Sequence, residues 1–140
     1  MFKKALLLLP IFSFGVAHSQ NDGNHEMVSM VQLLANPEKY DNKIVTVVGV
    51  GWLKFEENQI CLTRDHLRVM ATKNCFWLGS FKREKWDAEL LMKIKEFNGS
   101  YVKVTGRFNS QDMGHLNLFA GSISDVTAYS FHEPEFGPSW

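Results

Sequence analysis

The chain has 140 residues, of which 45% are hydrophobic, 13% aromatic and 21% charged. This length and composition fit one globular domain and leave little room for a second. The 15 basic side chains balance the 15 acidic ones, which argues against a strongly basic nucleic-acid-binding protein and against an acidic disordered tail.

The first 19 residues predict a secretory signal peptide. Lys3 and Lys4 precede an apolar stretch, and Ala17 and Ser19 are small residues at the spacing of a cleavage site. The apolar stretch is shorter than the about 20 residues that span a bilayer. Cleavage after Ser19 would leave 13 basic side chains against 15 acidic ones, a net charge of −2. We therefore expect a periplasmic or secreted protein without a membrane span.

Cys61 and Cys75 are the two cysteines of the chain. In an exported protein, two thiols at this separation predict one structural disulfide, and two free thiols are the alternative. The loop that they would close has about 15 residues, which corresponds to roughly 3 kcal/mol in the chain-entropy model. A zinc site would need further ligands at suitable spacing, and the sequence offers none.

The mature chain begins with a predicted helix and a long strand. From Glu26 the apolar spacing is helical, and Pro37 ends that helix. The apolar face of this helix consists of Met27, Met30, Val31 and Leu34. Residues 43–55 are rich in Val, Ile and Thr, and the glycines within them predict a strongly curved strand.

Residues 59–63 and 75–80 predict two antiparallel strands joined by a polar stretch over 64–74. If Cys61 lies opposite Cys75, period-two alternation puts Ile60 and Phe76 on one face. The disulfide and Trp77 then share the other, less apolar face. Trp77 is either covered there by a second layer or open to a ligand.

The rest of the chain predicts one more helix and the closing strands. In chain order these are a helix over 86–97, a strand over 101–109 with a bend at Gly106, a loop over 110–114, strand material over 116–131 broken near Gly121, and a tail over 132–140. Residues 20–131 would thus form a single domain.

The order helix, three strands, helix, two strands is the order of a five-stranded oligonucleotide/oligosaccharide-binding (OB) barrel. Alternating strands with glycine bends suit a small closed barrel. We therefore predict a mainly β protein, an OB-fold-like barrel with an N-terminal helix and a helix between its third and fourth strands. An α+β sandwich is the rival fold.

Two segments resemble small exported bacterial OB-fold domains of the tRNA-anticodon-binding-like type. The first runs from Leu34 through Asn36-Pro37 and Tyr40-Asp41-Asn42-Lys43 into a valine-rich strand, and the second is Gly99 to Gly106. The resemblance covers about residues 27–130 and implies a binding face more than a reaction. Asn42 stands where such domains often carry Gly, at a left-handed position that Asn tolerates.

Barrels of this class commonly bind ligands on the face of their second and third strands and the loops that border it. In this chain that region is residues 59–80, which contain two arginines and a tryptophan, residue types enriched at binding hot spots. The candidate binding residues are Arg64, His66, Arg68 and Trp77. The tail aromatics Phe136 and Trp140 are further candidates for contact with a partner.

The sequence offers little for catalysis. No nucleophile elbow or phosphate-binding loop is present, and the histidines lack metal-ligand spacing, although His66 and His115 lie in loops that could meet. The acidic pair Glu56-Glu57 fits a solvated turn better than a nuclease site. The best basic cluster is residues 82–86. It is weak evidence for nucleic-acid binding, because the mature chain has a net charge of −2 and would not attract phosphate overall.

We therefore expect a non-catalytic binding module without a cofactor or metal, whose partner is another protein of the cell envelope. Inhibition of an enzyme or neutralisation of a toxin would be one form of that role. A binder of single-stranded nucleic acid or oligosaccharide is the alternative, and a metal-dependent hydrolase is the least favoured.

Overall fold

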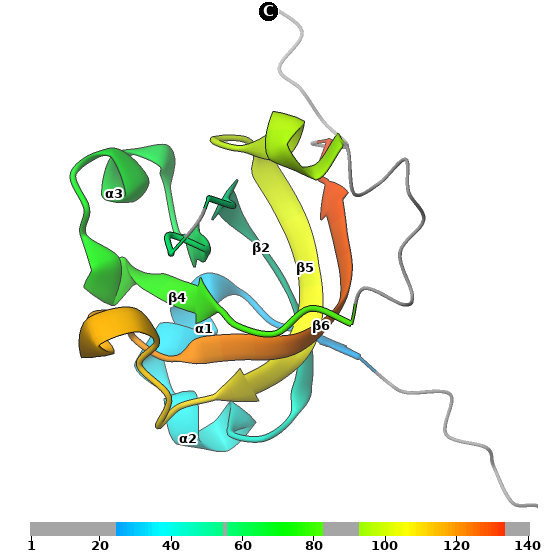
Figure 1. Cartoon of the computed structure of the whole chain (residues 1–140). Helices are drawn as coiled ribbons and strands as arrows, with labels where there is room; N and C mark the ends of the chain where they lie inside the picture. The colour runs from blue at the N-terminus through cyan, green and yellow to red at the C-terminus, as the bar shows by residue number, and fades with distance from the viewer. Residues whose placement is uncertain (1–24, 55, 83–92, 134–140) are drawn as a thin grey trace, which may run out of the picture.

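The computed structural model of the chain describes residues 25–54, 56–82 and 93–133 (Figure 1). The expected signal peptide, the tail aromatics Phe136 and Trp140, and most of the basic cluster at residues 82–86 lie outside the described residues. So does most of the helix expected over 86–97, of which the described end forms the 3-10 helix η3 (Ile94–Phe97).

Five strands form a closed barrel, and a sixth, short strand lies against it (Figure 1). The strands are β1 (Glu26–Met27), β2 (Ile44–Trp52), β3 (Gln59–Cys61), β4 (Cys75–Leu78), β5 (Tyr101–Asn109) and β6 (Ser122–Phe131). Their order around the barrel is β2-β3-β4-β6-β5, and β5 pairs back onto β2. The pairing β4–β6 is parallel and the other four are antiparallel. This confirms the mainly β, OB-fold-like barrel and excludes the α+β sandwich.

The long strand β2 closes the barrel because it forms hydrogen bonds with two neighbouring strands, one after the other along its length. Its residues Ile44–Val50 pair with β5, and its end from Val50 to Trp52 pairs with β3. Where the neighbours change, backbones approach closely: a Cβ on Gly49 would lie 2.8 Å from the carbonyl oxygen of Cys61. The glycine therefore permits the sharp curvature that the sequence predicted.

The barrel interior contains the apolar residues that the strand alternation predicts. Val102, Val104 and Phe108 of β5 are fully buried, and the register of β5 against β6 shifts between Thr105 and Arg107, at the predicted bend. On the outer side, the Thr46 and Thr105 hydroxyls form a buried hydrogen bond of 2.8 Å. The outward face of β5 is thus partly covered as well.

The N-terminal helix is present but shorter than predicted. A Ser29–Gln32 capping box starts α1 (Met30–Ala35), and Pro37 begins the next short helix, α2 (Pro37–Tyr40). The predicted apolar face was right for Met30, which is buried, and for Leu34, which packs against the core. It was wrong for Met27 and Val31, which are exposed, and it missed the buried Leu33. Met27 lies outside the helix because it belongs to β1, which pairs in parallel with β2.

Two regions expected to be irregular or extended contain short helices. The polar stretch after β3 holds α3 (Arg64–Arg68) and the 3-10 helix η1 (Thr72–Asn74), so a helix lies between β3 and β4. Residues 116–120 were expected as strand material, but 116 and 117 belong to the 3-10 helix η4 (His115–Asn117) and 118–120 follow it as a loop. Among the described helices, none has the length and apolar character to cross a membrane.

Candidate functional site

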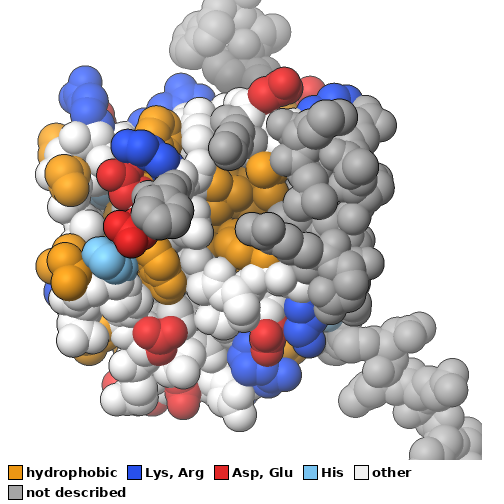
Figure 2. Space-filling model, in the orientation of Figure 1, with side chains coloured by type: hydrophobic (Ala, Val, Ile, Leu, Met, Phe, Trp, Pro, Cys, Tyr) orange, Lys and Arg blue, Asp and Glu red, His pale blue; other side chains and the backbone are white. Residues whose placement is uncertain are grey.

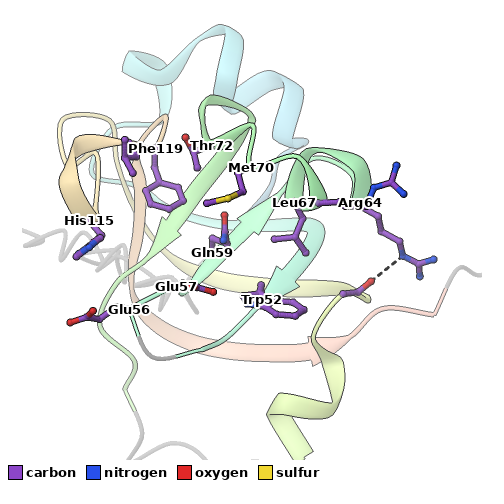
Figure 3. Close-up of a pocket in the computed structure, with 13 residues that line it drawn as sticks. Trp52, Glu56, Glu57, Gln59, Arg64, Leu67, Met70, Thr72, His115 and Phe119 are labelled. Atoms are coloured by element: carbon purple, nitrogen blue, oxygen red, sulfur yellow. Dashed lines mark hydrogen bonds between the residues drawn. The ribbon is translucent and has the colours of Figure 1, made fainter.

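A groove of about 710 Å³ lies on the outer side of β3 (Figure 3). Its walls come from the β2–β3 turn, from α3 with the loop that follows, and from the loop that contains η4. The lining residues are Trp52, Glu56, Glu57, Gln59, Arg64, Leu67, Arg68, Met70, Thr72, Gly99, His115, Leu118 and Phe119. This volume falls in the range of ordinary ligand pockets.

The groove has a rigid base because a disulfide and an apolar cluster lie beneath it. Cys61 and Cys75 are bonded (S–S 2.08 Å) and face each other across β3 and β4, which confirms the predicted disulfide. Both are fully buried and pack in one cluster with Phe119, Leu67 and Trp77. Since Leu67 and Phe119 also line the groove, this cluster fixes the position of its apolar floor.

Trp77 belongs to the second layer that covers the barrel. Its ring stacks on His115 with centroids 6.1 Å apart and contacts Phe119 at 5.4 Å. Gly114 lies so close that a Cβ there would overlap the Trp77 ring. Trp77 is therefore half-buried and is not among the groove-lining residues.

The two loops that form the upper walls are tied to each other. The Lys73 ammonium donates hydrogen bonds to the carbonyl oxygens of Phe119 (3.0 Å) and Asn117 (3.4 Å). Leu116 and Asn117 have positive φ angles of 55° and 57°, a conformation that non-glycine residues rarely adopt. The hydrogen bonds from Lys73 therefore hold this wall against the loop that follows α3.

The arginines of α3 lie at one end of the groove. The Arg64 Nε donates to the Gly99 carbonyl oxygen (3.0 Å), and its guanidinium lies over the Tyr101 ring at 5.8 Å. Arg68 pairs with Asp65 (3.2 Å) in a largely exposed ion pair. Two of the four predicted binding residues therefore meet at this groove.

His66, a third predicted binding residue, lies at the start of α3 and outside the groove. Its backbone N–H donates to the Thr63 hydroxyl (3.2 Å), and its ring Nδ1 lies 3.1 Å from the same oxygen, so it takes part in the N-terminal cap of α3. His66 does not line the groove, and it does not join His115 in a metal site. The described part of the chain holds no cluster of three or more His, Cys, Asp or Glu side chains that could bind a metal ion.

Several lining residues were not predicted as site residues. Trp52 and Gln59 lie on strands whose outward face is the groove, and Leu118 and Phe119 come from a loop about 60 residues after Gln59 in the chain. The preference of OB barrels for the loops that border strands two and three could have pointed to the η4 loop. The contact between that loop and Trp77 has no signal in the sequence.

No protein-family model matches this chain, and no curated protein is significantly similar to it.

Proposed function

We propose that this protein is an exported, non-catalytic binding module of the bacterial OB-fold type, and that its groove recognises another protein of the cell envelope. The observation that supports the proposal best is the apolar rim of the groove. Met70 is 79% exposed and Leu118 45% exposed, and both line the groove. Val69 and Leu116, beside them, are exposed too.

Exposed apolar side chains gathered around a concave site are typical of protein-binding surfaces. Methionine suits such a surface because its flexible thioether adapts to different partners. In Figure 2 hydrophobic side chains reach the surface over the α3 region, and acidic and basic side chains are interspersed across the same face. A site for single-stranded nucleic acid would be expected to have a continuous basic groove instead.

Export rests on the N-terminal sequence, and the buried disulfide is compatible with an oxidising compartment. Inhibition of an enzyme or neutralisation of a toxin would be specific forms of the same activity. Both need only a surface that binds the target tightly.

An oligosaccharide is the second candidate ligand. Trp52 and Phe119 offer aromatic rings in the groove, and Gln59 between them offers amide donors and acceptors. A sugar ring could stack on either aromatic ring. The exposed methionine and leucines at the rim favour the protein partner.

The test is affinity capture from native envelope extract with residues 20–140 as bait and the disulfide oxidised. We expect a captured protein that is lost with a Met70→Ser/Leu118→Ser bait. The matched control is Val31→Ser, because Val31 is an exposed apolar residue on α1, outside the groove (58% exposed). Capture that is unaffected by the double variant would rule out the groove as the binding site.

A further inference from the structure

The charged residues of the groove are segregated. Arg64 and Arg68 come from α3, whereas Glu56 and Glu57 come from the β2–β3 turn. In Figure 3 Arg64 lies at one end and Glu56 at the other, beside His115, with Leu67 and Gln59 between them. The groove thus has a basic end, an apolar middle and an acidic end.

The basic end is positioned to bind a carboxylate. The hydrogen bond to Gly99 occupies the Nε–H of Arg64, and the Tyr101 ring supports the guanidinium from one side. A guanidinium carries five N–H donors, so the terminal nitrogens keep the planar fork that matches a carboxylate. The Arg68–Asp65 pair is largely exposed. Such pairs are weak, and an incoming carboxylate can therefore share Arg68.

The acidic end is accessible in the same way. Glu56 is exposed and occupies a left-handed position in the turn (φ 61°). Glu57 forms an exposed ion pair with Lys54 at 3.5 Å, which is also weak. A cation from a partner can therefore approach both carboxylates.

Backbone pairing is not the mode of recognition at this site. β3, beneath the groove, already pairs with β2 on one side and with β4 on the other. A bound segment must therefore be recognised through its side chains. Charge order is then the feature that can set its direction, because complementary charges fix register and exclude wrong partners.

We infer that the groove binds a short protein segment in a fixed charge order: a carboxylate at the Arg64–Arg68 end, an apolar side chain over Leu67 and Phe119, and a lysine or arginine at the Glu56–Glu57 end. The inference rests on the proposed function and narrows it to the chemistry of the partner. Burial of the apolar side chain would exclude water and strengthen the two charge pairs beside it.

The test uses four labelled synthetic peptides with one Leu-Phe centre and different flanks, measured by fluorescence anisotropy at low salt. The flanks are aspartates on one side and lysines on the other, aspartates on both sides, lysines on both sides, and serines on both sides. We expect the peptide with mixed flanks to bind about tenfold more tightly than any other, and to lose that advantage at high salt.

A charge-reversed protein makes the test specific. In Arg64→Glu/Arg68→Glu both ends of the groove are acidic, so the preference should move to the peptide with lysines on both sides. The matched control Lys39→Glu/Lys43→Glu changes the net charge equally on and beside α2, far from α3 (Figure 1). This control should keep the preference for mixed flanks. A gain of binding for one peptide cannot result from misfolding.

The outcomes separate the two proposals. Equal binding of all four peptides, or the same shift of preference in both double variants, would overturn the charge order and leave the binding module intact. Binding of none of them would also overturn the inference, and the envelope capture would then decide the proposed function independently.

Discussion

Cys61 and Cys75 occupy directly opposed positions on β3 and β4, with their Cα atoms 4.0 Å apart, and their disulfide lies beneath the floor of the groove. The bond therefore links the stability of the barrel to the shape of the candidate site. The loop that it closes contains α3 and the arginines at the basic end of the groove.

Replacement of both cysteines by alanine should lower the free energy of unfolding by about 3 kcal/mol, because the open chain gains entropy when unfolded. Urea denaturation of the oxidised protein and the Cys61→Ala/Cys75→Ala variant measures the difference. An unchanged denaturation midpoint would show that the disulfide contributes nothing to stability.

Gly114→Ala should destabilise the protein by about 1–3 kcal/mol, because φ is 62° and the new Cβ would overlap the Trp77 ring. Gly99→Ala is the control: its φ is 79°, but no other atom lies within 4 Å of the added Cβ. Gly114 also has a ψ of −155°, a conformation essentially restricted to glycine, so the difference between the two thermal midpoints measures this backbone strain together with the contact with Trp77. Equal midpoints would contradict the close packing of the η4 loop on Trp77.

The Asp41–Ser110 contact should make stability depend on acid pH. The Asp41 carboxylate accepts hydrogen bonds from the Ser110 N–H and hydroxyl, both at 2.8 Å, and these hold the pKa of Asp41 below its ordinary value of 3.8. The stabilisation that these hydrogen bonds give the folded state is therefore fully present above the ordinary pKa of Asp41. It is lost as the pH falls through the lower pKa that Asp41 has in the folded state.

Asp41→Asn should be less stable than the native protein at neutral pH, and the difference should shrink as the pH approaches 2. Urea denaturation at several pH values measures this. Ser110→Ala removes only the hydroxyl donor, so it should give a smaller change in the same direction. An Asp41→Asn variant with native stability at neutral pH would contradict the account.

Tyr129→Phe should leave stability unchanged or raise it by about 0–1 kcal/mol. The Tyr129 hydroxyl is buried beside Gly51 and has no hydrogen-bond partner within the described part of the chain. Removal of an unsatisfied polar group costs little. A loss above about 1 kcal/mol would show that the hydroxyl has a partner.

The buried Tyr129 hydroxyl should also make the protein less stable at alkaline pH. Burial raises the pKa of Tyr129 above its ordinary value of 10.0, so the unfolded chain releases the proton first. Stability should therefore fall as the pH rises from about 10 towards the pKa of the folded state. Tyr129→Phe should show a shallower fall between pH 9 and 11, and identical slopes would contradict the prediction.

The barrel could be predicted from the sequence where one local rule decides the structure. The presence of only two cysteines in an expected export product predicted the disulfide Cys61–Cys75, and Asn42 adopts the expected left-handed conformation (φ 60°). The bend at Gly106 also appears as a register shift. Each depends on a few consecutive residues or on one hairpin.

The features that the sequence did not predict depend on contacts between segments that are distant in the chain. Helical spacing alone assigned Met27 to the face of α1, whereas the parallel pairing of β1 with β2 decides its position. Arg64 and Arg68 were found because the face of the second and third strands is a known binding surface of OB barrels. Phe119 was missed because the hydrogen bonds from Lys73 and the packing of Gly114 on Trp77 bring its loop there.

Site-specific photo-crosslinking in living cells would show whether the groove contacts a protein partner. A photoreactive amino acid in place of Met70, at the rim of the groove, should give one discrete crosslinked protein. The same amino acid in place of Val31 on α1, which is also exposed, should not. A discrete product at Val31 alone, or the same products at both positions, would contradict a protein-binding role for the groove.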